Sequence, residues 1–318
     1  MKVSIVGAAG AIGRATVPEL LKGGHEIRVV GRSLQKLRAA FEKEKVEMVA
    51  ADIASAEGAA AAVEGCDLIL YTLGLPYSKK SFAAYPGMMK LMVEAAHEAG
   101  ARRLIHISNV YPYGKPLTQP VTEQHPRSPC SVKGKWRKEQ EDIVMAASAR
   151  RDLETIVLRF PDFYGPHTGQ NSMLHGVFEA ALHGKRGDIL GPADKPHEFL
   201  YVPDAGRLIA ALASRDDVWG EEYNFAGAGV TSMRQMAEEV FDAFGQPPKL
   251  RVAGPGMVRF LGLFMPIMRE LSEMSYLFTD PVILDDSKLV QRLGELPKTS
   301  YKSGILATSE FYRRQSRE

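Results

Sequence analysis

Val3-Ser4-Ile5-Val6 runs directly into Gly7-Ala8-Ala9-Gly10-Ala11-Ile12-Gly13, and this stretch decides the fold. The apolar run predicts a buried strand, and residues 11–21 repeat apolar side chains every three or four positions, as an amphipathic helix does. Glycines at such a junction permit a tight turn, let the backbone approach a diphosphate and let the helix pack closely on the strand. The amides at the helix start attract the anion. We therefore predict a dinucleotide site made by Gly7, Ala9, Gly10, Ala11, Ile12 and Gly13.

The first half of the chain continues this pattern of short strands and longer helices. Apolar runs predict strands at 3–6, 27–30, 47–50, 68–71, 104–107 and 155–158, and three- and four-residue apolar spacing predicts helices at 11–21, 34–44, 86–99 and 133–149. Such alternation is typical of βαβ units. We therefore predict an α/β fold, a Rossmann-type doubly wound parallel sheet with a smaller C-terminal α+β substrate lobe.

The regularity weakens after Arg159, where loops rich in glycine and proline occupy 161–169 and 184–196. We therefore expect residues 1–160 to form an NAD(P)-binding Rossmann domain and residues 161–318 a substrate-binding lobe. Two further strand patterns, at 199–202 and 223–225, indicate that residues 199–225 return to the main sheet.

The composition narrows the class of protein. The 318 residues carry 40 basic and 38 acidic side chains, a formal charge of +2, without a long basic run, so nucleic acid is not an expected partner. Cys66 and Cys130 lie far apart and outside any metal-ligand spacing, so we expect no metal site and a reducing, cytoplasmic location. No apolar run reaches the roughly 20 residues that cross a bilayer, so no membrane partner is expected.

The second predicted strand ends in Gly31-Arg32-Ser33, where a dinucleotide fold that prefers NAD carries an acidic residue. Without a carboxylate to repel it, a 2′-phosphate can take charge-assisted hydrogen bonds from Arg32 and Ser33. NADP(H) is thus the predicted cofactor and NAD the alternative, although Arg32 could instead lie in solvent beside the next helix. Asp52 and Ile53, after the third strand, are expected near the adenine, and Asp52 is equally suited to cap a helix.

Taken together, these residues resemble the short-chain dehydrogenase/reductase superfamily, in its extended or atypical branch of NAD-dependent epimerases and dehydratases. The spacing of the three glycines matches that branch. The resemblance runs almost the whole length of the chain, through Ile105-His106-Ile107-Ser108-Asn109-Val110-Tyr111, Arg159-Phe160-Pro161, Tyr164-Gly165-Pro166 and Phe199-Leu200-Tyr201-Val202-Pro203-Asp204. It implies the fold far more strongly than the reaction, because one fold hosts many chemistries.

The resemblance also implies further contacts with the cofactor. They include the turn after the fourth strand, a hydroxyl that steadies the reacting oxygen, and residues lining the nicotinamide side of the cleft. In chain order these residues are Thr72, Leu73, Gly74, Ser108, Pro161 and Phe163. Each position also has a local explanation, as a turn residue, a satisfied strand-end hydroxyl or a packing side chain.

The chain departs from the family at its catalytic pair, a tyrosine and a lysine four residues later on one helix face. Aligned on the flanking residues, Lys133 and Arg137 stand at these two places. Arg137 can bind a ribose but cannot exchange protons usefully. Lys133 could act as acid or base if its pKa is lowered, or could simply be a solvated lysine at a helix start. Tyr111 and Tyr113, just beyond Ser108, are the other candidates for the proton donor, and packing around Pro112 is their alternative role.

Two features bear on the substrate. Nucleotide-sugar members of the family carry an arginine that clamps the diphosphate, whereas this chain has His197-Glu198-Phe199 there, and histidine is a poorer, pH-dependent clamp. The apolar, Met-rich stretch at 257–268 suits the wall of a hydrophobic site, and core packing or a subunit contact would explain it as well.

Three functions follow from these observations. The first is an NADP(H)-dependent oxidoreductase that transfers hydride to or from a small or apolar carbonyl or alcohol compound. The second is a nucleotide-sugar epimerase or dehydratase that uses bound NAD, and the third is a non-catalytic protein that senses NADP(H). Each binds a small molecule and is expected as a monomer or homodimer.

Overall fold

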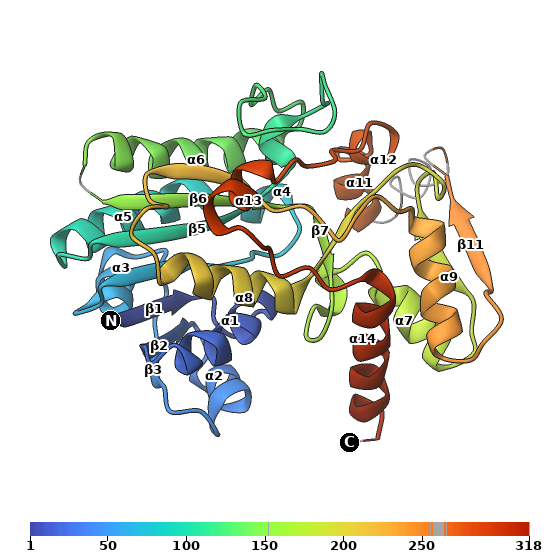
Figure 1. Ribbon diagram of the computed structural model, residues 1–318, viewed down its shortest axis with the longest axis horizontal. Coiled ribbons are helices and arrows are strands. Elements are labelled where there is room, and N and C mark those ends of the chain that lie inside the picture. The colour runs from blue at the N-terminus through green and yellow to red at the C-terminus, as the bar shows by residue number, and fades with distance from the viewer. Residues whose placement is uncertain (152, 255, 257–263, 265, 318) are drawn as a thin grey trace.

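A parallel sheet forms the centre of the first lobe in the computed structural model, which describes residues 1–317 except 152, 255, 257–263 and 265 (Figure 1). Seven strands of the described residues lie in the order β10-β6-β5-β4-β1-β2-β3, and all neighbours are parallel. Their bounds are β1 (Lys2–Val6), β2 (Glu26–Gly31), β3 (Glu47–Ala50), β4 (Leu68–Tyr71), β5 (Arg103–Asn109), β6 (Glu154–Phe160) and β10 (Glu221–Asn224). The strand order reverses between β1 and β4, which is where doubly wound sheets bind ligands.

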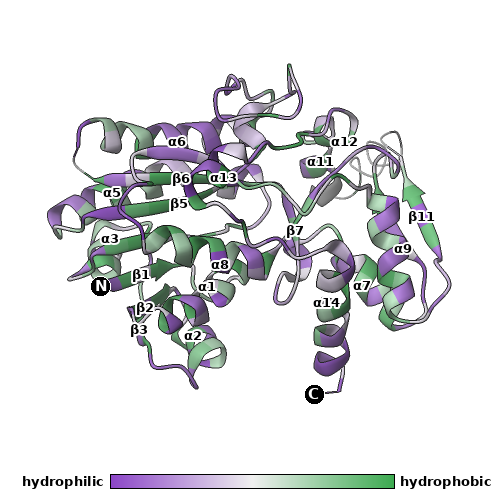
Figure 2. Ribbon diagram, in the orientation of Figure 1, coloured by the Kyte–Doolittle hydropathy of each residue, from purple (hydrophilic) through white to green (hydrophobic). Residues whose placement is uncertain are grey.

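Helices cover both faces of this sheet. One face carries α1 (Ala11–Lys22), α2 (Leu34–Phe41) and α8 (Val202–Ala213), and the other carries α3 (Ala56–Val63), α5 (Tyr85–Glu98) and α6 (Val132–Ala149). The strands supply both cores because successive side chains point to opposite faces: Val3 and Ile5 pack on the first, Val6 on the second. The apolar strands between the helices stand out in Figure 2.

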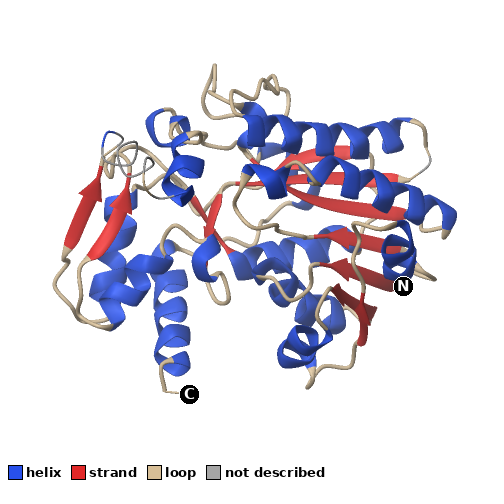
Figure 3. Ribbon diagram, turned by 180° about the vertical axis from the view of Figure 1, so that it is seen from behind, coloured by secondary structure: helices blue, strands red, loops and turns tan. Residues whose placement is uncertain are grey.

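A second lobe holds two small parallel sheets and a helical cluster. In it, β7 (Asp162–Tyr164) pairs with β9 (Phe199–Tyr201), and β8 (Gly187–Leu190) pairs with β11 (Leu250–Ala253). Aromatic side chains such as Phe178, Phe241 and Tyr312 join α7 (His175–Leu182), α9 (Met233–Ala243) and α14 (Tyr301–Gln315) into one core. From behind, the β8–β11 pair forms the outer edge of this lobe (Figure 3).

The remaining elements of the described residues are short. They are α4 (Lys79–Phe82), α11 (Pro266–Ser272), α12 (Tyr276–Thr279), α13 (Ser287–Leu293) and the 3-10 turns η1 (Tyr111–Tyr113) and η2 (Gly169–Asn171). Over the described part of the chain, no helix has the length and apolarity required to span a bilayer.

The predicted fold is confirmed. Of the two strands predicted to return to the main sheet, only β10 does so, at the edge beside β6, whereas β9 pairs with β7 in the second lobe because Phe199 and Tyr201 pack there. Strands β5 and β6 are longer than predicted, because polar residues such as Arg103, Asn109 and Arg159 continue the ladder beyond the apolar run. The division into units at residue 160 stays a prediction.

Candidate active site

The turn between β1 and α1 is as tight as the glycine spacing predicted. Gly7 has φ +83°, and a Cβ atom there would lie 2.7 Å from the Leu73 Cα atom. A Cβ atom on Gly13 would lie 2.4 Å from the carbonyl oxygen of Ala8. Both neighbours are backbone, so only glycine lets strand, turn and helix approach this closely.

The N-terminus of α1 is open to a ligand. Gly10 is the N-cap residue, no side chain caps the helix, and its first turn contains no acidic residue. The first amides of a helix have no partner within it and carry partial positive charge. The amides of Ala11, Ile12 and Gly13 are therefore suited to a diphosphate, so a dinucleotide fits this part of the structure.

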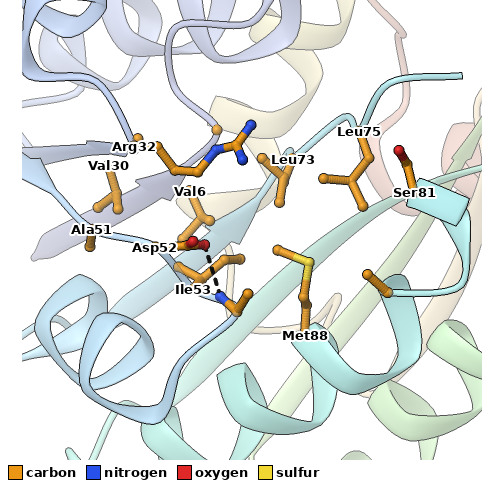
Figure 4. A pocket seen from close by; sticks show the side chains of 14 residues that line it. Val6, Val30, Arg32, Ala51, Asp52, Ile53, Leu73, Leu75, Ser81 and Met88 are labelled. Atoms are coloured by element: carbon orange, nitrogen blue, oxygen red, sulfur yellow. Dashed lines mark hydrogen bonds between the residues drawn. The ribbon is translucent and has the colours of Figure 1, made fainter.

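A pocket of about 220 Å³ lies beside this turn, at the carboxyl ends of β1, β2 and β3 (Figure 4). Its walls include Val6, Gly7, Val30, Gly31, Arg32, Ala51, Asp52, Ile53, Leu73, Leu75 and Met88. Arg32 is exposed at the rim, and Ile53 is buried in the wall. The pocket is mostly apolar with charged groups at its edge, which suits an adenosine.

The neighbouring polar groups have local roles that leave the pocket accessible. The Ser33 hydroxyl caps α2 by accepting from the Lys36 amide at 3.3 Å, and its own hydrogen remains free to donate. Asp52 accepts from the Ala54 amide at 3.2 Å within the loop, but it does not cap a helix as the alternative expected, because Ser55 is the N-cap of α3. Thr72 donates its hydroxyl to the Val6 carbonyl at 2.9 Å, and this bond fixes the turn that carries Leu73 and Gly74.

Ser108 and Tyr113 belong to a buried network instead of a cleft. Ser108 Oγ donates to Glu141 Oε1 at 2.5 Å, and Arg159 donates to both oxygens of the same carboxylate, at 3.0 and 2.6 Å. Arg159 also donates to the Tyr113 phenol at 3.1 Å, and this phenol donates to Asn224 Oδ1 at 2.8 Å. Burial raises the pKa of Tyr113 to about 12. The structure thus encloses Tyr113 away from any ligand.

Lys133 is fully buried between two carboxylates. Its amine donates to the side chain of Glu270, to the Glu270 carbonyl at 3.2 Å and to Glu273 Oε2 at 3.1 Å. Lys133 is therefore not the solvated lysine that was the alternative to a catalytic role. Sequence reasoning missed both glutamates, because nothing local connects them to a helix some 140 residues earlier.

Arg137 ties α6 to the sheet. It donates to the Ile107 carbonyl at 3.0 Å and to Gln140, and its guanidinium stacks 4.8 Å from the centre of the Tyr85 ring. These contacts hold the end of β5, which is followed in the chain by the 3-10 turn that carries Tyr111.

Tyr111 lies just beyond the carboxyl end of β5, in the same apolar cluster as Tyr77. Its phenol is paired with that of Tyr77, and burial, Tyr77 and Asp162 raise its pKa. Pro161 is buried and Phe163 half-buried, packed against the first core. His197 Nε2 lies 2.8 Å from Asp162 Oδ2, so the residue at the arginine position already has an acidic partner. Most of the Met-rich stretch at 257–268 lies outside the described residues.

Glu198, next to His197, gives a testable pH dependence. Its buried carboxylate accepts the Leu284 amide at 2.8 Å and the Gly227 amide at 3.2 Å, and burial raises its pKa to about 7 from 4.5. Between these pH values the folded chain binds more protons than the unfolded chain, so stability falls as pH rises through this window. The loss is about 3 kcal/mol. The free energy of unfolding, measured with urea at several pH values, should fall across this window in the native chain and not in Glu198→Gln. The same fall with pH in both proteins would contradict the assignment.

Nowhere in the part of the chain that the structure describes do three or more histidine, cysteine, aspartate or glutamate side chains gather to hold a metal ion.

Comparisons with known proteins agree with this geometry. The model of the NAD dependent epimerase/dehydratase family matches residues 3–226. A UDP-glucose 4-epimerase of Mycolicibacterium smegmatis is 26% identical over 99% of this chain and 100% of its own. A 3 beta-hydroxysteroid dehydrogenase/Delta 5-->4-isomerase of Mycobacterium tuberculosis is 26% identical over 92% of this chain and 81% of its own. The solved dTDP-glucose 4,6-dehydratase of Streptomyces venezuelae, with NAD bound, superposes with a TM-score of 0.82 at 20% identity, covering 99% of this chain and 97% of that one.

Proposed function

Because the chain belongs to the NAD dependent epimerase/dehydratase family, we propose that it is an enzyme that binds a nicotinamide dinucleotide and acts by hydride transfer at an alcohol or carbonyl carbon of a small molecule. The observation that carries this proposal is the uncapped N-terminus of α1 beside the pocket at β1, β2 and β3. When bound, the cofactor supplies the hydride chemistry at its nicotinamide ring.

The chain's own residues bind the cofactor, transfer the proton and position these groups. The amides of Ala11, Ile12 and Gly13 bind the diphosphate, and Leu73 and Ile53 bury the adenosine. Tyr111 is assigned the proton transfer at the substrate oxygen, because Tyr113, the other phenol after Ser108, is enclosed in the buried network. Burial raises the pKa of Tyr111, which favours its neutral form in the free chain. Ser108 and Arg137 hold β5 and its following turn in position.

Arg32 sets the choice between cofactors. It stands at the pocket rim with no hydrogen bond or ion pair to another described residue, so its guanidinium is free for a 2′-phosphate. We expect Arg32→Ala to weaken NADP+ binding about 10- to 100-fold, the value of a charge-assisted hydrogen bond or two. NAD+ binding should change less than threefold, as measured by calorimetry. Equal losses for both nucleotides would contradict the NADP(H) assignment.

For the substrate, the relatives favour a nucleotide sugar, since a UDP-glucose 4-epimerase and several dTDP-glucose 4,6-dehydratases are similar over most of the chain. The second candidate is a net NADP(H)-dependent oxidoreductase for an apolar alcohol or carbonyl compound. Arg32, the His197–Asp162 pair in place of an arginine clamp, and the steroid dehydrogenase among the relatives support it.

One assay separates these candidates. The chain is incubated with NAD+ or NADP+ and either UDP-glucose, dTDP-glucose or a hydroxysteroid, while absorbance at the reduced nicotinamide band and product composition are followed. A converted sugar without accumulated reduced cofactor supports the epimerase or dehydratase. Stoichiometric reduced cofactor supports the oxidoreductase. Tight nucleotide binding with no turnover on any substrate would overturn both in favour of a sensor.

A further inference from the structure

Lys79, Lys133, Glu270 and Glu273 form a charge cluster, here called the latch, where the substrate lobe meets the first domain. Besides the contacts of Lys133, the Lys79 amine lies 3.5 Å from Glu273 Oε2, and the Lys79 amide donates to Glu270 Oε2 at 3.1 Å. The Val132 amide, at the start of α6, donates to Glu273 Oε1 at 2.5 Å. Two carboxylates thus satisfy two ammonium groups and two backbone donors.

The basic and acidic residues of the latch come from different parts of the chain. Its basic half comes from α4 and α6 of the first domain, and Lys133 is fully buried; its acidic half comes from α11 and the residue after it. Lys79 keeps half of its side chain exposed, so the cluster has a side open to solvent. A buried ion pair contributes little net stability, because desolvation offsets the attraction. Stabilising the contact between the lobes is therefore not a sufficient explanation for this cluster.

The latch lies next to Tyr77 and Tyr111. The Lys133 amine lies 5.0 Å from the centre of the Tyr77 ring, and the Tyr77 phenol is paired with Tyr111, the proposed proton donor. Met274 and Tyr276, which follow Glu273, pack in the same apolar cluster as Tyr77 and Tyr111. The two glutamates therefore place carboxylate groups beside the proposed reaction centre.

We propose that Lys79 and Lys133 form the binding site for an acid group of the substrate, and that Glu270 and Glu273 occupy this site until the substrate displaces them. The inference rests on the proposed function, because it assigns the substrate position next to Tyr111. The ligand chemistry is an oxyanion, either a carboxylate or a phosphate. Charge-assisted hydrogen bonds from two ammonium groups and the Val132 amide would bind it.

The test titrates the full chain with malonate and, in a separate arm, with inorganic phosphate. In Glu270→Gln/Glu273→Gln the competing carboxylates are gone while the side-chain shapes remain. We expect this variant to bind at least one probe about tenfold more tightly than the native chain. Adding Lys133→Met to the double variant should remove the gain. The preferred probe tells a carboxylic acid from a phosphorylated substrate.

The control is Glu98→Gln/Glu139→Gln, which removes the same two negative charges from exposed positions on α5 and α6. It should leave probe affinity unchanged. A gain in probe affinity equal to that of Glu270→Gln/Glu273→Gln would overturn the proposal. So would a gain in that variant that persists when Lys133→Met is added. Thermal unfolding and NADP+ binding show whether each variant is folded.

A second measurement uses the native chain. Saturating malonate or phosphate should raise hydrogen exchange in residues 269–276, because the displaced glutamates no longer hold this segment. Unchanged exchange at saturation would also overturn the proposal. If probe affinity changes as expected and no nicotinamide nucleotide binds, the acid site is supported and the proposed function is wrong. If a nucleotide binds and probe affinity does not change, the proposed function is supported and the acid site is wrong.

Discussion

Replacing Gly13 with alanine is expected to weaken nicotinamide dinucleotide binding about 100-fold or more, the cost of losing one or two charge-assisted hydrogen bonds from the α1 amides to the diphosphate. The new methyl group would lie 2.4 Å from the Ala8 carbonyl oxygen and 2.6 Å from the Ala8 Cα atom. Neither backbone atom can swing away as a side chain would, so α1 must move off β1 and take its amides with it. Overpacking of this kind also lowers the free energy of unfolding by about 1–3 kcal/mol.

The matched control is Gly176→Ala in α7, where an added Cβ atom meets nothing within 4 Å. Titration calorimetry measures nucleotide affinity, and urea unfolding confirms that each variant folds. If Gly13→Ala folds and binds NADP+ within threefold of the native chain, the assignment of the α1 N-terminus as the diphosphate site is wrong.

Replacing Arg159 with methionine is expected to lower the free energy of unfolding by about 3–5 kcal/mol, the cost of leaving a buried charge without its partner. Arg159 and Glu141 are both fully buried, and without Arg159 the carboxylate keeps only one cationic partner, Arg127 at 3.2 Å, beside the Ser108 hydroxyl. The same substitution removes a donor from the Tyr113 phenol. Urea unfolding with an unchanged slope measures the effect.

The control for this prediction is Arg215→Met, which breaks an exposed bidentate pair with Asp217. An exposed ion pair contributes at most about 1 kcal/mol, so this variant should stay near native stability. Glu141→Gln should cost less than Arg159→Met, since the buried Arg159 guanidinium would still pair with Glu222. Equal effects of Arg159→Met and Arg215→Met would show that the buried network does not anchor β5, β6 and α6.

The sequence predicted the features that depend on neighbouring residues. The strand, turn and helix at Val3 to Leu21 follow from hydrophobic period and glycine spacing, and the fold and the family are confirmed. The lining of the pocket by Arg32, Asp52, Ile53 and Leu73 follows in turn, because parallel strands bring their carboxyl ends to one edge. The roles of these residues in binding stay predictions.

Long-range pairing limited what the sequence could predict about catalysis. Motif alignment placed Lys133 at the family's tyrosine position, but its partners Glu270 and Glu273 lie in another lobe. Similarly, Tyr111 and Tyr113 are indistinguishable in sequence; the η1 turn directs Tyr113 into the network of Arg159 and Asn224. The directions of the two tyrosine side chains depend on a 3-10 turn of three residues, and hydrophobic periodicity does not predict how so short a turn is oriented.

The most direct test of the central claim is calorimetric titration of nucleotide-free chain with NADP+ and, separately, NAD+. Saturable binding of one nucleotide per chain, tighter for NADP+, is the predicted result. An absence of binding heat for both nucleotides, from protein that unfolds cooperatively, would contradict the claim that the amides of Ala11, Ile12 and Gly13 receive a cofactor diphosphate.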